Sequence, residues 1–310
     1  MGHSFTNDIA RSLRPLSCVS HQRHTMAVLT LLRRVLGVTG HLPSKHALSP
    51  SLQRASRDFL AGPPPSAGGQ WITHCCFYEL STVLGKAWAG TTHIKGEAAK
   101  EWMTSHVDYP DARTKEQLSI YYMGSSIAQA MRRGAVVLAG QRKGDVTAVL
   151  IVSEKTHNQP TPTHYTGHWW WELGVTLRLA DMVLPALLQC QIYQGQQGQS
   201  QRKASALSDL KQGYHDQNRP RTQYWSVEMV GIDPRQQGLG YGRELVDRLC
   251  ALADEAGVAC YLEAAGPKNA LFYEGSGFTS IRSLSVDDPT DPKGLPLQVE
   301  IMRRLPQPHF

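Results

Sequence analysis

The chain has 310 residues, of which 41% are hydrophobic and 19% are charged, which is enough for one or two packed domains. Its formal net charge of +6 is unevenly placed. Residues 1–70 hold eight of the 32 basic and two of the 26 acidic residues, which leaves 24 of each in the remainder. This formally neutral remainder argues against nucleic-acid binding. No apolar run reaches the roughly 18–20 residues of a membrane span, so we expect no membrane partner.

The six cysteines show no C-x-x-C spacing and no Cys/His cluster. A disulfide scaffold and a zinc site are therefore not predicted, and we assign no metal ligands. Free thiols suit a reducing compartment, so we expect a cytoplasmic protein.

Residues 1–70 are rich in Arg and Ser and nearly free of acids. That composition is typical of a mitochondrial transit peptide, and residues 25–38 suit a short basic amphipathic helix. A disordered tail and a start codon placed too far upstream are the alternatives. Residues 61–69 (AGPPPSAGG) read as a flexible linker. We therefore predict an extension over 1–70 and a folded domain over 71–310.

The start of the predicted domain reads as helices followed by a hairpin. Helical spacing marks residues 79–89 and 114–133, and Gly134 ends the second segment. Residues 135–140 and 146–154 are predicted strands, separated by the turn Arg142-Lys143-Gly144-Asp145.

Residues 157–215 match no pattern as a whole and are predicted to be an insertion. Within it, 175–193 reads as an apolar helix, 194–201 as a Gln/Gly linker and 204–214 as a short helix. The triple tryptophan at 169–171 is assigned to packing rather than to an aromatic box, because three consecutive residues cannot share one face.

A glycine-rich run follows at 235–242 (RQQGLGYG), between a predicted strand at 225–232 and a predicted amphipathic helix at 243–256. Glycines allow a tight turn and a close backbone approach. The first N–H groups of a helix have no internal partner, and the helix dipole favours negative charge there. The run therefore predicts a cradle for a pyrophosphate.

The glycine run alone leaves the cofactor open. The Walker pattern is absent, because no Lys-Ser or Lys-Thr follows the glycines. The dinucleotide fingerprint needs its third glycine where Arg243 stands. Glu263 lies at about the distance expected of a ribose-binding acid, so spacing by itself does not dismiss NAD.

The neighbouring segments narrow the choice. Asp233-Pro234 ends the strand before the turn. A second strand is predicted at 259–264, followed by Asn269–Phe278 (NALFYEGSGF) and two closing strands at 279–286 and 297–304.

With these residues the chain resembles the GNAT superfamily of acyl-CoA-dependent N-acetyltransferases, in particular the puromycin N-acetyltransferase-like and related fungal members. Arg235-x-x-Gly238-x-Gly240 is similar to the family's pyrophosphate motif, Q/R-x-x-G-x-G/A, and 269–278 is similar to its N-x-x-F/Y-Y-E-x-x-G-F segment. The resemblance covers about residues 222–304. It implies an α/β (α+β) GNAT fold with a mixed, mostly antiparallel sheet of six to seven strands, a splayed parallel pair and flanking helices.

The resemblance also implies acetyl-CoA as cofactor and assigns its contacts. Backbone groups of Val230 and Ile232 would meet the pantetheine arm, and Arg235 would reach the 3′-phosphoadenosine side. Asn269 would bond near the pantetheine or cap the following helix. The full implied set is Val230, Ile232, Arg235, Gln236, Gln237, Gly238, Leu239, Gly240, Tyr241, Gly242, Asn269 and Tyr273.

Three residues are catalytic candidates. Tyr273 takes the family's position for the acid beside the CoA sulfur, with plain packing as its alternative. Glu228 is the candidate base, because an acid inside an apolar strand is costly unless it is paired or used. Glu263 on the next strand is the rival, as base or as substrate anchor. A salt bridge is the structural alternative for both carboxylates.

We therefore expect an acetyl-CoA-dependent N-acetyltransferase that acts on a primary amine of a small molecule by direct attack in a ternary complex, as a monomer or homodimer. A protein N-acetyltransferase acting on lysine or N-terminal amines and a non-catalytic acyl-CoA-binding module are the alternatives. An NAD oxidoreductase ranks behind them.

Overall fold

The computed structural model describes residues 50–62, 70–72, 77–90, 98–105, 109, 111–132, 134–155, 198–199, 202–210, 222–291 and 293–308. The basic N-terminus up to residue 49, the triple tryptophan and the apolar segment 175–193 lie outside the described residues. The targeting and linker expectations therefore stay predictions.

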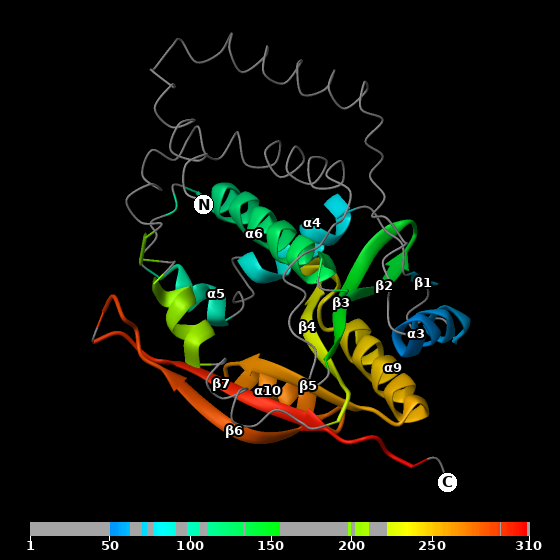
Figure 1. Cartoon of the computed structure of the whole chain (residues 1–310). Coiled ribbons are helices and arrows are strands. Elements are labelled where there is room, and N and C mark those ends of the chain that lie inside the picture. The colour runs from blue at the N-terminus through cyan, green and yellow to red at the C-terminus, as the bar shows by residue number, and fades with distance from the viewer. Residues whose placement is uncertain are drawn as a thin grey trace, which may run out of the picture.

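The described residues form a mixed α/β structure (Figure 1). The helices are α3 (Pro50–Ala61), α4 (Phe77–Ala89), α5 (Ala98–Met103), α6 (Ala112–Arg132), the 3-10 helix η1 (Pro234–Gln236), α9 (Tyr241–Ala256) and α10 (Pro267–Glu274). Residues 202–210 are also helical. The strands are β1 (Gln70–Ile72), β2 (Val136–Arg142), β3 (Asp145–Lys155), β4 (Tyr224–Ile232), β5 (Ala259–Ala265), β6 (Thr279–Val286) and β7 (Leu297–Arg304).

The strands form one seven-stranded sheet in the order β1-β2-β3-β4-β5-β7-β6. Five neighbouring pairs are antiparallel, and β4 and β5 run parallel. A parallel pair needs a crossover, and α9 supplies it between β4 and β5. The predicted mixed sheet with one parallel pair is confirmed.

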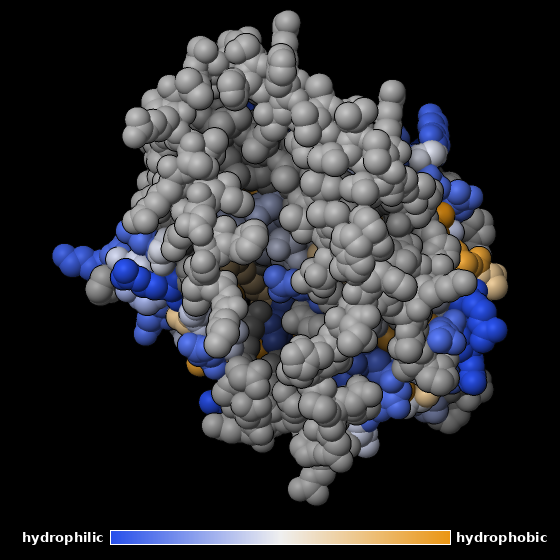
Figure 2. Space-filling model, turned by 45° about the horizontal axis from the view of Figure 1, so that its top comes forward, coloured by the Kyte–Doolittle hydropathy of each residue, from blue (hydrophilic) through white to orange (hydrophobic). Residues whose placement is uncertain are grey.

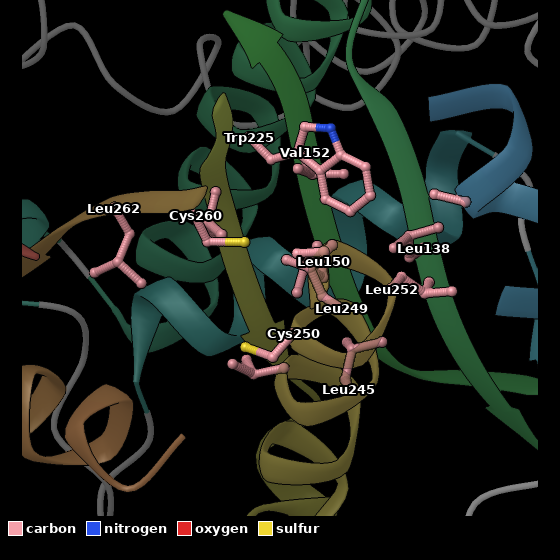
Figure 3. Close-up of a cluster of buried hydrophobic side chains, with 14 of the residues drawn as sticks. Leu138, Leu150, Val152, Trp225, Leu245, Leu249, Cys250, Leu252, Cys260 and Leu262 are labelled. Carbon is pink, nitrogen blue, oxygen red and sulfur yellow. The ribbon is translucent and has the colours of Figure 1, made fainter. Parts of the chain in front are cut away.

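Helices cover both faces of the sheet (Figure 1). On one face α3 and α9 pack on the strands, with Leu245, Leu249 and Trp225 in the same buried cluster (Figure 3). On the other face α4 and α6 bury a second cluster. Strand β3 serves both clusters, because Leu150 faces α9 while Ile151 faces the opposite cluster. Both free cysteines of the described part, Cys250 and Cys260, lie in the α9 cluster.

A third cluster joins the distal strands to the helices that precede them. It contains Trp102 of α5, Leu207 of the 202–210 helix, and apolar residues from the end of β5 and from β6 and β7. In Figure 1 the yellow-green 202–210 helix lies next to α5. The described end of the predicted insertion is therefore packed onto the domain.

Two elements correct the predicted organisation. Helix α3 falls inside the stretch 1–70 that was expected to lie outside the domain, yet Leu52 and Phe59 are 2% and 0% exposed in the α9 cluster. The folded domain therefore includes residues 50–61. Strand β1 was not predicted, because three residues are too few to establish a period; its Trp71 ring packs 5.1 Å from that of Phe59.

The coloured surface in Figure 2 is mostly hydrophilic, with hydrophobic residues in small separate patches. Within the described part of the chain, no helix has both the length and the apolar character that a bilayer crossing requires.

Candidate active site

The parallel strands β4 and β5 separate partway along their length. Their pairing runs from Tyr224↔Ala259 to Val227↔Leu262 and then stops. Beyond that point β4 stays paired with β3, and β5 stays paired with β7. The opening between residues 228–232 and 263–265 is called the fork below. Its strands keep backbone groups that the partner strand does not satisfy, so an extended ligand arm can pair there.

Glu228 and Glu263 are the first residues beyond the last parallel pair. Glu228 is also the extra residue of a β-bulge, because Val152 pairs with Val227 while Ile151 pairs with Met229. A bulge re-aims side chains and is frequent beside active sites. The structure thus brings both predicted carboxylates to the mouth of the fork.

Both carboxylates lie on the face opposite α9. Leu262 and Ala264 belong to the α9 cluster, so Glu263 between them points the other way. Glu228 bonds to Ser153, whose neighbour Val152 also belongs to the α9 cluster. The edge-to-face pair of Tyr224 and Tyr261, with ring centroids 4.8 Å apart, lies beside them on the same strands.

The salt-bridge alternative for Glu228 is realised in the structure. Its carboxylate lies 3.1 Å from Nζ of Lys155 and accepts a hydrogen bond from the Ser153 hydroxyl. The Glu228 side chain is 20% exposed. A carboxylate paired with a cation is in the deprotonated form that a general base requires, so the ion pair is compatible with that role.

The glycine run leads from the end of β4 to the amino terminus of α9. Gly238 and Gly240 have φ of 82° and 90°, and a Cβ on either would meet no atom within 4 Å. Backbone conformation therefore explains these glycines, because side chains are strained at such φ. Gly240 is the N-cap of α9 and supplies no side-chain cap. The first amides of α9 are thus not capped by its side chain, which suits an anionic ligand.

Arg235 is paired within its own turn, and its contact with the 3′-phosphoadenosine side stays a prediction. Its guanidinium makes two hydrogen bonds to Asp233, at 3.1 and 2.7 Å, while the side chain remains 72% exposed. Burial raises the pKa of Asp233, but hydrogen bonds from the side chain and backbone of Arg235 outweigh burial and lower it. Arg235 thereby stabilises the turn at η1. It lines a small pocket together with Arg142 and Lys143 of the β2–β3 turn.

The pyrophosphate pattern also fits two residues later, as Gln237-x-x-Gly240-x-Gly242, and the contacts favour this register. Tyr241 between the glycines is 1% exposed in the core. A Cβ on Gly242 would lie 3.1 Å from Ile232 and 3.4 Å from Phe272, so only glycine lets α9 approach this closely. Gln237 donates to the carbonyl of Ile232 at 3.2 Å, at the end of β4.

The second register reveals a residue that the sequence analysis missed. Arg243, in the first turn of α9, stacks over Phe272 at 5.2 Å and donates to the Ser276 hydroxyl at 3.1 Å. That hydroxyl donates in turn to Asp247. A cation in the first turn of a helix is unfavourable next to the positive end of the helix dipole unless an anion binds there. The position of Arg243 directly after the glycine run was therefore the sequence signal that could have identified it.

Helix α10 holds the remaining candidates. Tyr273 packs against Phe272 and Phe278, with ring centroids 5.0 and 5.9 Å away, and is half-buried. Asn269 donates to the carbonyl of Ala265, the last residue of β5, at 2.9 Å. Its expected alternative as an N-cap is wrong, because Gly266 is the N-cap of α10. Asn269 instead ties α10 to the edge of the fork.

Among the described residues no group of three His, Cys, Asp or Glu could hold a metal ion. A mixed sheet whose one parallel pair opens beside the amino terminus of α9 agrees with the fold expected of the GNAT family. Residues 209–278 match the model of the acetyltransferase (GNAT) family. The chain therefore contains a GNAT acetyltransferase domain.

Known proteins are similar over different lengths. The chain is 34% identical over 83 residues to an uncharacterised N-acetyltransferase of Schizosaccharomyces pombe, which covers 27% of this chain and 32% of that protein. The structure of arylalkylamine N-acetyltransferase 2 from Aedes aegypti matches 77% of this chain and 99% of its own, with 12% identity and a TM-score of 0.46. A histone acetyltransferase HPA2-related acetyltransferase from Corynebacterium glutamicum matches 74% and 91%, with 15% identity and a TM-score of 0.40.

Proposed function

We propose that this protein is an acetyl-CoA-dependent N-acetyltransferase that acetylates a primary amine of a small molecule by direct attack in a ternary complex. The observation that carries the proposal is the fork: β4 and β5 part at Glu228 and Glu263, next to the uncapped amino terminus of α9. Members of the matched family transfer acetyl groups to amines.

The cofactor would be held mainly by backbone. Amides from Gly238 to Arg243 would hold the pyrophosphate, and the backbone of Val230 and Ile232 borders the fork where the pantetheine arm would pair. We assign Arg243 as the side chain that meets phosphate, because its contacts with Phe272 and Ser276 hold it at the first turn of α9.

Acetyl-CoA supplies an activated acetyl group as a thioester. An amine with a pKa near 10.4 is mostly protonated at neutral pH, so it must lose a proton before attack and another as the amide forms. Glu228 is the group we assign to take up the proton, because it lies at the fork and is partly exposed. Tyr273 is assigned to donate a proton to the departing sulfur. Glu263 is assigned to anchor the acceptor's cation.

A small acceptor is favoured by charge. Beyond residue 70 the chain carries 24 basic and 24 acidic residues, and this balance supports a small acceptor over a strongly charged polypeptide tail. The identity of the amine would then depend on side chains on the face of the fork opposite α9, where Tyr224 and Tyr261 offer aromatic contact.

The test is an amine panel with acetyl-CoA, followed by free-thiol release and by mass spectrometry of the product. The panel contains 2-phenylethylamine, spermidine, glucosamine and lysine- and N-terminal-amine peptides. Turnover of a small amine above the peptides supports the proposal. Preferential acetylation of the peptides would reassign the acceptor class. Micromolar CoA binding without turnover of any amine would leave an acyl-CoA-binding module in place of the enzyme.

A further inference from the structure

Two side chains of β3 converge on a single oxygen of Glu228. The Ser153 hydroxyl donates to Oε1 at 2.5 Å, and Nζ of Lys155 lies 3.1 Å from the same Oε1. The carboxylate is therefore held at Oε1 by a hydrogen bond and an ion pair that come from the neighbouring strand.

The strand geometry explains this convergence. Ser153 and Lys155 are two residues apart and point to the same face of β3, where they pair in register with Ser226 and Tyr224. The bulge at Glu228 breaks the regular alternation and lets its side chain reach both of them. Ser153 is 2% exposed, so its hydroxyl has little freedom to turn to water.

We propose that Lys155, together with Ser153, is a positioning residue for Glu228, and this rests on the proposed function. The two residues anchor Oε1 and thereby hold the carboxylate at the mouth of the fork, where it takes the proton. The ammonium group of Lys155 also keeps the carboxylate ionised to lower pH, because a nearby opposite charge favours the charged form.

Several other groups on the elements around Glu228 bear on the same titration. They are Glu79 and Lys86 of α4, Tyr224 of β4, Tyr261 and Glu263 of β5, and Arg303 of β7. Helix α9 packs on the opposite face of β4. The effect assigned to Lys155 must therefore be separated from a general change of charge at this end of the domain.

The test uses the full chain and the substitutions Lys155→Met, Lys155→Arg, Ser153→Ala and, as a matched control, Lys86→Met. Lys86 is 33% exposed against 35% for Lys155, and its ion-pair partner is Glu116, at 4.0 Å, rather than Glu228. The carboxyl carbon of Glu228 is followed against pH by NMR of glutamate-labelled protein, with Glu228→Gln providing the assignment. In parallel, kcat/KM is measured from pH 5 to 9 with 2-phenylethylamine or the fastest amine of the panel.

Loss of the cation lets the carboxylate bind a proton more readily, so the titration midpoint in Lys155→Met should rise by about 0.5–1 pH unit. This figure is discounted for the exposure of the pair. The acidic limb of kcat/KM should move upward by the same amount, and kcat at pH 7 should fall about tenfold. Lys155→Arg should restore the midpoint, and Lys86→Met, which changes only the general charge, should shift it much less. Ser153→Ala should lower kcat with a smaller shift of the limb.

An unchanged midpoint in Lys155→Met, or an equal shift in Lys86→Met, overturns the proposal. A lower melting temperature with an unmoved limb also overturns it, because this is the signature of a purely structural ion pair. A midpoint that moves in a protein without turnover of any amine contradicts the proposed enzyme while the anchoring of Glu228 stands. The two failures are therefore distinguishable.

Discussion

Lys203 and Asp288 form an ion pair that is almost completely withdrawn from solvent. Nζ lies 2.5 Å from Oδ2, and the two side chains are 1% and 5% exposed. The ammonium group also donates to the carbonyl of Trp102 and to the Ser105 hydroxyl, at 3.1 and 2.8 Å. One side chain thus joins the 202–210 helix, the end of α5 and the loop between β6 and β7.

Lys203→Met should lower the free energy of unfolding by about 3–5 kcal/mol, because it leaves the Asp288 carboxylate buried without its cation. Urea denaturation followed by circular dichroism measures the loss. The control is Arg235→Met, which breaks an ion pair whose arginine is 72% exposed and should cost less than about 1 kcal/mol. Similar losses in both variants would contradict the distinction drawn from burial.

The Asp288 pair also predicts a pH dependence of stability. Burial raises the pKa of Asp288, but hydrogen bonds from Lys203 and Thr290 and the charge of Lys203 outweigh burial and lower the pKa to about 2. A carboxylate with a depressed folded-state pKa contributes stability above its unfolded value of 3.8, and that contribution is lost as the pH falls toward 2. The free energy of unfolding should therefore decline between pH 4 and 2, and Asp288→Asn should flatten that decline. An equally steep decline in Asp288→Asn would show that the Asp288 carboxylate is not the source of the pH dependence.

Gly240→Ala should destabilise the domain by about 1–2 kcal/mol, because φ is 90° there and a side chain is strained at that angle. The same change should weaken CoA binding about tenfold, since the amides that follow Gly240 would shift. Isothermal titration with CoA and thermal denaturation provide the two readouts. Gly198→Ala is the control, because a Cβ there meets no atom within 4 Å and no positive φ is recorded. Tight CoA binding by Gly240→Ala would show that the glycine run is not the cofactor cradle.

Arg243→Met should weaken CoA binding about tenfold, the effect of one lost charge-assisted hydrogen bond. Arg235→Met should change it less than threefold, because that guanidinium is engaged by Asp233. Titrations at 50 and 300 mM salt should show the larger salt dependence for the protein that retains Arg243. A greater loss in Arg235→Met would restore the register that begins at Arg235.

Tyr273→Phe should reduce kcat about 100-fold or more while CoA binding stays within twofold, because the phenol oxygen is assigned to proton donation and the ring to packing. Glu228→Gln should lower kcat comparably and remove the acidic limb of the pH profile. Stopped-time assays with CoA titrations separate the two effects. Full activity in both variants would move the protein toward the non-catalytic alternative.

The chain from residue 224 onward was predictable in detail. The predicted strands 279–286 and 297–304 coincide with β6 and β7, and the predicted helix 243–256 lies within α9. Local signals decide these elements: Asp233-Pro234 and Gly257 mark the ends, and alternation or helical spacing marks the interior. Strand β1 and helix α3 were not predicted, because the first is too short to show a period and the second lies in a stretch nearly free of acids.

At the site, the sequence identified the residue types and the tertiary structure decided their roles. The sequence fits the glycine motif equally well in two overlapping registers, which begin at Arg235 and at Gln237. Only the burial of Tyr241 and the close approach of Gly242 to Ile232 and Phe272 favour the second register. The sequence placed Glu228 in an apolar strand and suggested a salt bridge, but it did not identify Lys155 as the partner.

By itself the sequence determined the family of the domain and most elements from residue 224 onward, and it predicted the cofactor class, because these depend on short-range patterns. The partners of Glu228 and Lys203 lie on other elements, in the second case 85 positions along the chain at Asp288. Sheet register, the bulge and burial bring such residues together. Only the tertiary structure could therefore decide which charges are paired, and at which atom of Glu228 the pairing occurs.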